Sequence, residues 1–398
     1  MNSTPVYLNH MGMINSLGSD NQNILDKLFN SDNSSMSEYL SEKLGHKFMV
    51  GAVTEALPTI PAGLSEHNSR NNQLLLKALQ PFETTVIEAI EQFGASRVGI
   101  VLGTSTSGID QGEQALAHYA QNQELPQDYH YQQQELGDSA QFLAQYLKIS
   151  GPAYVISTAC SSSGKVFASA RSLIQTGICD LVLVGGVDSL CEMTLNGFRA
   201  LEATSESITN PFSVNRQGIN IGEGAALFFM SKQPSEIQLC GVGESSDAHH
   251  ISAPHPQGFG AAQAMRAALD DAQLEAKEIH YLNLHGTGTP LNDSMESHAY
   301  QQILTPLTPC SSTKPFIGHT LGAAGANELA FCWLLLSSLN KKQQLIPHLY
   351  DGQVDPELSE VALVGKQQYA SKLNFAMSNS FAFGGNNVSV IIGKSDHD

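Results

Sequence analysis

The sequence predicts an α/β fold made of two similar halves. Short apolar runs at residues 98–102, 181–184 and 237–242 carry no polar alternation, which is typical of strands covered on both faces of a sheet. Stretches with helical spacing of apolar residues separate these runs, which favours parallel α/β units. The same pattern then begins again, so we expect a duplication with halves at residues 1–235 and 236–398, although no residue-level repeat is visible.

Local patterns place the elements of the first half. Strands are expected at residues 5–8, 98–102, 154–156, 181–184 and at the end of 218–230. Helices are expected at residues 21–29, 72–93, 111–147 and after Cys160, with interruptions at Pro81 and near Pro126. Residues 30–70 are polar and contain Pro58 and Pro61, which predicts surface loops.

The second half follows the same scheme. Strands are expected at residues 237–242, 281–284, 316–317, 375–378 and 388–392. Helices are expected at residues 260–271, 293–304 and 321–339. The last helix contains the longest charge-free apolar run, 329–339, which is well short of the ~20 residues that cross a bilayer. We interpret it as a buried helix and expect no membrane span.

Composition excludes several classes of function. The chain has 398 residues, with 20 Lys and Arg against 38 Asp and Glu, so its formal net charge is −18. This charge argues against binding to nucleic acid or to an anionic membrane surface. The six cysteines form no C-x-x-C pair, and residues 1–20 show no secretory signal pattern. We therefore expect free thiols and a cytoplasmic protein.

The segment around Cys160 organises the first half. The predicted strand 154–156 is followed by a turn of small residues, and then by apolar residues at helical spacing up to Gly177. Cys160 therefore stands where a strand meets a helix N-terminus, whose unpaired N–H groups favour a thiolate. The arrangement matches a nucleophile elbow built around sulfur. A buried core cysteine fits this stretch equally well.

Three other stretches carry groups that can act with this sulfur. Residues 284–290 and 314–320 each place a histidine, His285 and His319, at a predicted strand tip, and residues 380–386 form a glycine turn between strands. A single histidine is usually a satisfied polar group, so none of these stretches is decisive alone. In open α/β sheets the strand tips meet at one crevice, which predicts one shared pocket.

Four sequence motifs together resemble a known family. STACSSSG, HGTGTPLND, KPFIGHTLGAAGANE and NSFAFGGNN are similar to the signatures of β-ketoacyl-acyl carrier protein synthases of the elongating type, condensing enzymes of the thiolase superfamily. The resemblance extends over nearly the whole chain. It implies a thiolase-like duplicated fold with five layers, αβαβα, and two mixed sheets. It also implies a dimer, an acyl carrier protein as partner, and no cofactor or metal.

The resemblance implies five catalytic residues: Cys160, His285, His319, Lys314 and Glu328. Cys160 matches the nucleophile that accepts the acyl group. His285 and His319 match the paired histidines that stabilise the enolate left when malonyl loses carbon dioxide. Lys314 and Glu328 match a buried pair, and we expect them to fix the tautomer and angle of His319.

The resemblance also implies substrate contacts. Phe383 matches the gate over the acyl pocket, and the backbone N–H groups of Cys160 and Phe383 could bind an oxyanion. Thr287 and Thr289 match positions that contact the pantetheine arm. Ala382 stands where many relatives have glycine before the gate phenylalanine, and its Cβ could restrict the swing of the gate.

Two further departures concern the substrate rather than the reaction. Asn387 follows Asn386 where relatives have Thr-Asn, and residues 213–219 replace a segment that often carries an acidic residue and Arg-Asp-Gly-Phe. Both leave the condensation intact and leave acyl length and type open.

The leading functional hypothesis is decarboxylative condensation of malonyl with a Cys160-bound acyl chain, in type II fatty acid or related polyketide synthesis. One alternative is a ketosynthase subunit of a specialised polyene or polyketide system that acts in a heterodimer rather than a homodimer. Another is a non-catalytic chain-length partner, against which Cys160, His285 and His319 all argue.

Three other classes of enzyme fit the sequence less well. A thiolase would need a second cysteine at the Phe383 turn, and an initiating synthase would need an asparagine at position 319. The paired histidines also argue against a cysteine hydrolase.

Two groups of polar residues have other interpretations. His249, His250 and His255 suggest a metal site, but no carboxylate or cysteine completes a ligand set at standard spacing. Some basic residues are candidates for docking a carrier protein, and ordinary solvated charges explain each of them equally well: Arg70, Lys77, Lys148, Arg171 and Arg199.

Overall fold

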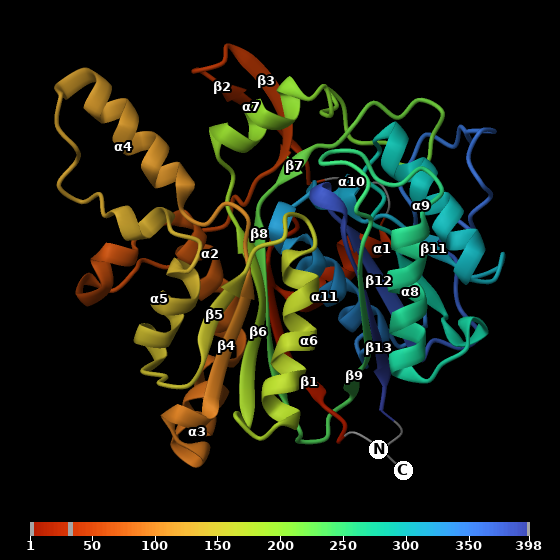
Figure 1. Ribbon diagram of the computed structural model, residues 1–398, viewed down its shortest axis with the longest axis horizontal. Coiled ribbons are helices and arrows are strands. Elements are labelled where there is room, and N and C mark those ends of the chain that lie inside the picture. Colours follow the sequence, from red (N-terminus) through yellow and green to blue (C-terminus); the bar gives the residue numbers. More distant parts are fainter. Residues whose placement is uncertain (1–3, 31–34, 396–398) are drawn as a thin grey trace.

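A computed structural model describes residues 4–30 and 35–395 (Figure 1). Its two halves each build a five-stranded sheet. The strands of the first are β1 (Tyr7–Ile14), β4 (Val98–Gly103), β5 (Ala153–Ile156), β6 (Leu181–Asp188) and β8 (Gly224–Ser231). The strands of the second are β9 (Ile237–Ser246), β10 (Tyr281–Asn283), β11 (Cys310–Ser311), β12 (Phe375–Phe381) and β13 (Asn386–Lys394).

The two sheets have the same topology. Their spatial orders are β5-β4-β6-β8-β1 and β11-β10-β12-β13-β9, so the third strand along the chain lies at one edge and the first at the other. In each sheet the first three strands in this order are parallel and the last two pair antiparallel. The sheets meet edge to edge where Tyr7 of β1 pairs with Gln238 of β9, which makes one continuous ten-stranded sheet. The predicted duplication of an α/β unit is confirmed.

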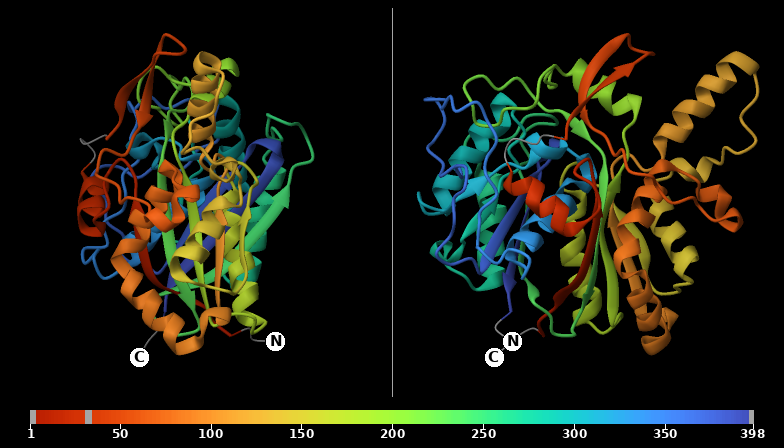
Figure 2. Two further views of the ribbon diagram at one scale, coloured as in Figure 1. Left: turned by 90° about the vertical axis from the view of Figure 1, so that its left-hand side faces the viewer. Right: turned by 180° about the vertical axis from the view of Figure 1, so that it is seen from behind.

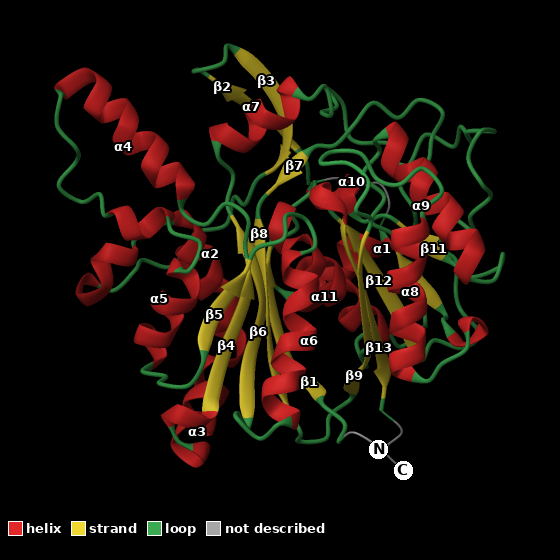
Figure 3. Cartoon of the chain, in the orientation of Figure 1, coloured by secondary structure: helices red, strands yellow, loops and turns green. Residues whose placement is uncertain are grey.

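Helices cover the sheets inside and outside. The helices are α1 (Asn21–Phe29), α2 (Arg70–Leu79), α3 (Glu83–Phe93), α4 (Ile109–Asn122), α5 (Asp138–Leu147), α6 (Ser162–Gln175), α7 (Glu192–Ala200), α8 (Phe259–Ala272), α9 (Pro290–Ile303), α10 (Lys314–Ile317) and α11 (Ala324–Leu336). α6 and α11 stand between the two sheets, α2, α3 and α5 cover one outer face, and α8 and α9 cover the other (Figures 1 and 3). This is the expected five-layer αβαβα order.

The central layer explains the most apolar helix of the sequence. Twelve of the 13 residues of α11 are buried, because both sheets and α6 pack around it. Among the residues that the structure describes, no helix is long and apolar enough to cross a membrane.

Two predictions of local structure were wrong, and one helix was missed. Residues 30–70 were expected to be loops, but the described part contains a hairpin of β2 (Ser37–Ser41) and β3 (His46–Gly51), which pairs with β7 (Ile221–Gly222). Most of β2 is exposed, so it carries no apolar signal. The expected strand at 316–317 is instead the helical turn α10, which Pro315 can begin because a helix start needs no N–H there. Helix α7 was not anticipated.

The arrangement directs the functional segments to one end of the sheet. β5, β10 and β11 lead into loops at the end where α7 and α10 lie, and the start of β1 and the end of β13 lie at the opposite end (Figures 1 and 2). The residues that follow these strands can therefore meet.

The two central helices touch at glycines. A methyl group added to Gly325 of α11 would lie 2.7 Å from the backbone nitrogen of Gly164 in α6, closer than carbon and nitrogen tolerate. We predict that Gly325→Ala lowers the melting temperature and pushes the two helices apart. Gly197→Ala is the matched control, because Gly197 is also helical and has open space around it; its melting temperature should stay or rise slightly. Equal melting temperatures for the two variants would contradict this packing.

Candidate active site

Cys160 lies on the tight turn between β5 and α6. The preceding residue, Ala159, has a positive φ of 53°, an uncommon conformation for a residue with a side chain. Two hydrogen bonds of the Ser162 hydroxyl hold the turn: it accepts from the Thr158 N–H at 2.8 Å and donates to the Ala159 carbonyl. The predicted placement of this cysteine between a strand and a helix N-terminus is confirmed.

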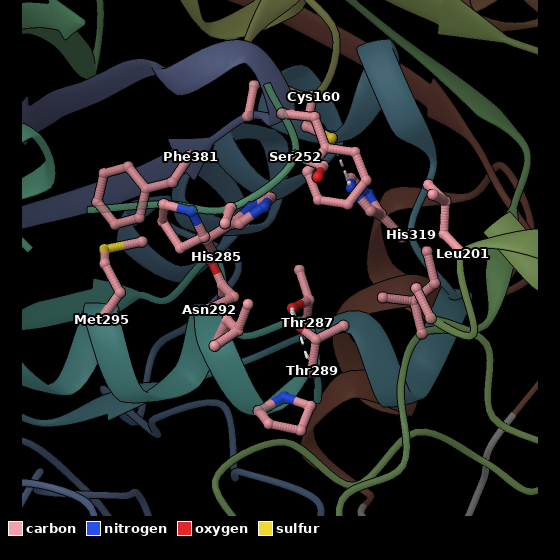
Figure 4. Close-up of a pocket in the computed structure, with 18 of the residues that line it drawn as sticks. Cys160, Leu201, Ser252, His285, Thr287, Thr289, Asn292, Met295, His319 and Phe381 are labelled. Carbon is pink, nitrogen blue, oxygen red and sulfur yellow. Dashed lines mark hydrogen bonds between the residues drawn. The ribbon is translucent and has the colours of Figure 1, made fainter. Parts of the chain in front are cut away.

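Two imidazole rings lie close to the Cys160 sulfur. His319 Nε2 lies 3.0 Å from Cys160 Sγ, and the rings of His285 and His319 are 5.3 Å apart and nearly perpendicular. A nitrogen of each ring and the sulfur all lie within 4.8 Å of one another (Figure 4). Cys160 and His285 are more than a hundred positions apart in the sequence and lie close together here. This was predicted for His285 because the ends of parallel strands meet at one edge of a sheet. His319 follows a helical turn instead, and its backbone is held by the Asn220 carbonyl at 2.7 Å and the Gly222 N–H at 2.9 Å.

Buried carboxylates hold the loop that carries His285. Glu296 of α9 accepts hydrogen bonds from the backbone N–H groups of His285 at 2.8 Å and Gly286 at 2.7 Å. One turn earlier, Asp293 accepts from the Gly288 N–H at 3.2 Å and from the Phe212 N–H at 2.8 Å. Neither residue has a role predicted from the sequence above, although two acidic residues three positions apart on a buried helix are a visible signal.

Lys314 and Glu328 form a buried ion pair behind His285. Nζ lies 2.5 Å from Glu328 Oε1, and both side chains are almost fully enclosed. The ammonium also donates to the His285 carbonyl oxygen and lies 3.4 Å from His285 Nδ1. The expectation that this pair orients His319 was wrong, because α10 turns the lysine toward the other imidazole. Burial raises the pKa of Glu328 to about 7, and the Lys314 charge opposes this rise.

Both imidazoles are neutral at physiological pH. Burial lowers the pKa of His285 and of His319 well below the usual range, and the positive charge of Lys314 lowers both further. A lysine N–H directed at His285 Nδ1 leaves the ring proton on Nε2. Each ring can then offer one N–H to a substrate oxygen.

The resting sulfur is a thiol. Burial raises the pKa of Cys160 to about 11, although the Lys314 charge and the backbone N–H groups of Phe383 and of Cys160 itself lower it. The expected preference for thiolate is therefore not met in the resting protein, because desolvation outweighs the helix N-terminus. The same two N–H groups point at the sulfur, so they could also donate to the carbonyl oxygen of an acyl group attached to it.

A cavity of about 280 Å³ joins these groups. Seven of the nine expected site residues line it: Cys160, His285, Thr287, Thr289, His319, Ala382 and Phe383. The other two, Lys314 and Glu328, lie behind the wall. The Thr287 and Thr289 hydroxyls are 2.9 Å apart, and Phe383 packs against Phe198 of α7 with ring centroids 5.6 Å apart.

Ala382 fits the backbone of the turn that carries Phe383. Its φ of −102° and ψ of 154° are ordinary extended values, so its Cβ introduces no strain here. The added methyl group restricts only conformations that need a positive φ at this position.

The histidine-rich loop shows no metal site. His250 Nδ1 accepts from backbone N–H groups of Ser252 and Ala253, and His255 Nδ1 accepts from that of Gln257, so these nitrogens close turns. Among the described residues, only Cys160, His285 and His319 bring ligand atoms close enough to hold a metal ion. The nearby positive charge of Lys314 disfavours a cation there.

Comparison with known proteins identifies the family. Residues 52–235 match the β-ketoacyl synthase N-terminal domain, and residues 236–349 match its C-terminal domain. Nodulation protein E of Rhizobium meliloti is 30% identical over 96% of this chain and 97% of its own length. The chain belongs to the β-ketoacyl synthase family.

Other members of this family align to different extents. The 3-oxoacyl-[acyl-carrier-protein] synthase 2 of Staphylococcus aureus is 33% identical over 61% of this chain, and the alignment spans 62% of its length. A solved complex of a ketosynthase with its chain length factor from Xenorhabdus doucetiae contains a chain with 46% identity, a TM-score of 0.94 and 98% coverage of both chains. A β-ketoacyl synthase from Burkholderia phymatum matches with 26% identity and a TM-score of 0.86, over 98% of this chain and all of its own.

The buried ion pair gives a prediction for stability. Lys314→Met leaves the Glu328 carboxylate buried without its partner, so we predict a loss of about 3–5 kcal/mol in the free energy of unfolding. The double variant Lys314→Met/Glu328→Gln removes both charges and should recover a large part of that loss. Denaturant titration measures both. A single variant as stable as the parent would show that the pair is not buried as described.

The raised pKa of Cys160 gives a prediction for its reactivity. Only the thiolate reacts with iodoacetamide, so below a pKa of about 11 each pH unit should raise the rate roughly tenfold, with no plateau near neutrality. Mass spectrometry of the labelled peptide distinguishes Cys160 from the other five cysteines. A plateau below about pH 8 would instead indicate a thiolate–imidazolium pair with His319.

Proposed function

We propose that the chain is a 3-oxoacyl-[acyl-carrier-protein] synthase, an acyltransferase that joins a Cys160-bound acyl chain to a malonyl unit. The observation that carries this proposal is the meeting of one thiol and two neutral imidazoles in one cavity. A hydrolase needs only one activated nucleophile and a water molecule. This site also has the N–H groups of His285 and His319, which can stabilise the negative charge of an enolate in addition to that of the oxyanion.

The first step is acyl transfer from the carrier. Cys160 sulfur attacks the carbonyl carbon of the carrier thioester, and the carbon–sulfur bond to the pantetheine breaks. The thiol proton ends on the departing carrier thiol. His319 Nε2–H donates to the Cys160 sulfur and stabilises the thiolate from which attack proceeds, and during attack the backbone N–H groups of Cys160 and Phe383 bind the oxyanion that forms on the thioester carbonyl.

The second step is condensation. The bond between the malonyl carboxylate and its α-carbon breaks, carbon dioxide leaves, and the electron pair becomes an enolate. The Nε2–H groups of His285 and His319 bind the enolate oxygen; one such donor typically contributes about 100- to 1000-fold in rate. The α-carbon then attacks the Cys160 thioester, the new carbon–carbon bond forms, and the sulfur leaves as a thiolate that takes a proton from water.

The remaining site residues position the substrates. We assign Thr287 and Thr289 to the pantetheine arm, and Phe383 with Ala382 to the gate over the acyl chain, because all four line the cavity beside Cys160. Lys314 and Glu328 are positioning residues, since Lys314 contacts His285, Glu328 holds Lys314, and neither lines the cavity. We also propose that the boundary between the two halves lies between residues 235 and 236. The six free cysteines support a cytoplasmic location.

A second candidate concerns the partner subunit. The 46% identity to a chain of the ketosynthase–chain length factor complex supports the alternative that this chain is a ketosynthase in a heterodimer. A homodimer is the other arrangement that we weigh. The role of a non-catalytic chain-length subunit has less support, because nucleophile and both imidazoles lie within reach of one another.

Separate variants test the two steps. With acyl- and malonyl-loaded carrier proteins, intact-protein mass spectrometry should show the acyl group on Cys160, and carbon dioxide should be released as product forms. Cys160→Ala should lose acylation and condensation. His319→Ala should retain part of the acylation but lose condensation by at least about 100-fold, because one enolate donor is gone.

The contradicting outcomes are distinct. Condensation by Cys160→Ala at the parental rate would remove the sulfur from the mechanism. Equal condensation by His319→Ala would remove the second imidazole and leave only an acyl-transfer role.

A further inference from the structure

The gate turn, residues 383–385, is closed at its base and contains two hinge positions. The Ala382 N–H donates to the Asn386 carbonyl oxygen at 2.8 Å, which closes the turn where β13 begins. Gly384 and Gly385 have φ values of 82° and 74°, which glycine adopts without strain. Rotation at these two glycines can move the gate side chain while the residues at the base of the turn stay in place.

Two successive asparagines fix the strand that leaves the gate turn. Because successive residues of a strand point to opposite faces of the sheet, the two side chains have different partners. Asn387 faces the loop before α8, where its Nδ2 donates to Asp247 Oδ1 at 2.7 Å. Asn386 faces α6, where its Oδ1 accepts from Lys165 Nζ at 3.3 Å. Val388, two positions after Asn386, also packs on α6.

Lys165 is a mostly buried cation that the proposed mechanism does not use. It lies in α6, five residues after Cys160, and its side chain is 14% exposed. An enclosed ammonium group needs polar partners, and this one has two: Glu244 of β9 at 3.2 Å and the Asn386 carbonyl. One charge therefore connects the helix that carries the nucleophile with the residue that follows the gate turn.

We propose that Lys165 is a positioning residue that holds the gate turn in its present conformation and so limits the entry of long acyl chains. The proposal rests on the proposed function, in which Phe383 covers the acyl chain. In this conformation the Phe383 ring packs on Phe198, with centroids 5.6 Å apart, and its backbone N–H points at the Cys160 sulfur. The hydrogen bond from Lys165 fixes Asn386, and without it the downstream end of the turn is free to move.

The length of the acyl group separates this role from a general structural one. An octanoyl chain must pass Phe383 to reach its pocket, whereas an acetyl group has no chain that must do so. The probes are octanoyl- and acetyl-N-acetylcysteamine, from which the Cys160 sulfur takes the acyl group while the N-acetylcysteamine thiol leaves. Intact-protein mass spectrometry measures both rates of acylation. Their ratio, octanoyl over acetyl, reports on the gate, because a general loss of structure lowers both rates together.

Two variants should move this ratio in opposite directions. Lys165→Met removes the hydrogen bond and should raise the ratio about three- to tenfold; it leaves Glu244 38% exposed, where water solvates the carboxylate. Asn386→Asp gives the acceptor a negative charge, which strengthens its hydrogen bond to Lys165, and should lower the ratio by a similar factor. In the double variant Lys165→Met/Asn386→Asp the new carboxylate has no ammonium to bind, so the ratio should not fall below the parental value.

Lys277→Met is the matched control. It also breaks a Lys–Glu ion pair, with Glu275 at 2.7 Å, but it lies between α8 and β10, outside the gate turn and its partners. Its ratio should equal that of the parent. If Lys165→Met does not fold, Asn386→Asp still decides, because it adds a charge without removing a side chain.

The contradicting outcomes separate this proposal from the proposed function. A parent that is acylated by both thioesters, together with parental ratios in Lys165→Met and Asn386→Asp, would overturn the role of Lys165 alone. A shift of both variants in the same direction would also overturn it. Failure of the parent to be acylated on Cys160 by either thioester would overturn the proposed function and with it the role of Lys165.

Discussion

The close crossing of α6 and α11 between the two sheets is the constraint on which the site depends. α6 begins beside Cys160, and α11 begins shortly after His319. The helices approach at Gly164 and Gly325, where neither has a side chain to separate them. Because each helix belongs to a different half of the duplicated fold, this contact sets the 3.0 Å between the sulfur and the imidazole together with the hydrogen bonds of the His319 backbone to Asn220 and Gly222.

Burial at this crossing determines the protonation states. Low polarity raises the pKa of the thiol and lowers that of both imidazoles, so the resting site carries neutral nucleophile and neutral donors. The positive charge of Lys314 lies behind His285, outside the cavity, and the Glu328 carboxylate pairs with it. Such a site favours reactions in which negative charge develops, and the proposed condensation is one of them.

Much of this could be predicted from the sequence, and the failures have physical reasons. Apolar runs without alternating polar residues predicted the central strands. The four sequence motifs predicted the residues that line the cavity. Pattern alone could not find the hairpin of β2 and β3, because its first strand is exposed. Nor could it show that Lys314 serves His285, since the direction of that side chain depends on the turn α10. The resting state of Cys160 was missed because burial cannot be read from the small residues beside it.

The most direct test of convergence is a crystal structure of the protein with an octanoyl group on Cys160. The account predicts that the thioester oxygen lies about 2.7–3.1 Å from the backbone nitrogens of Cys160 and Phe383. It also predicts that Nε2 of His285 and of His319 both face the same free space beside the thioester carbon. A thioester oxygen directed away from those nitrogens, or either imidazole turned out of the cavity, would contradict it.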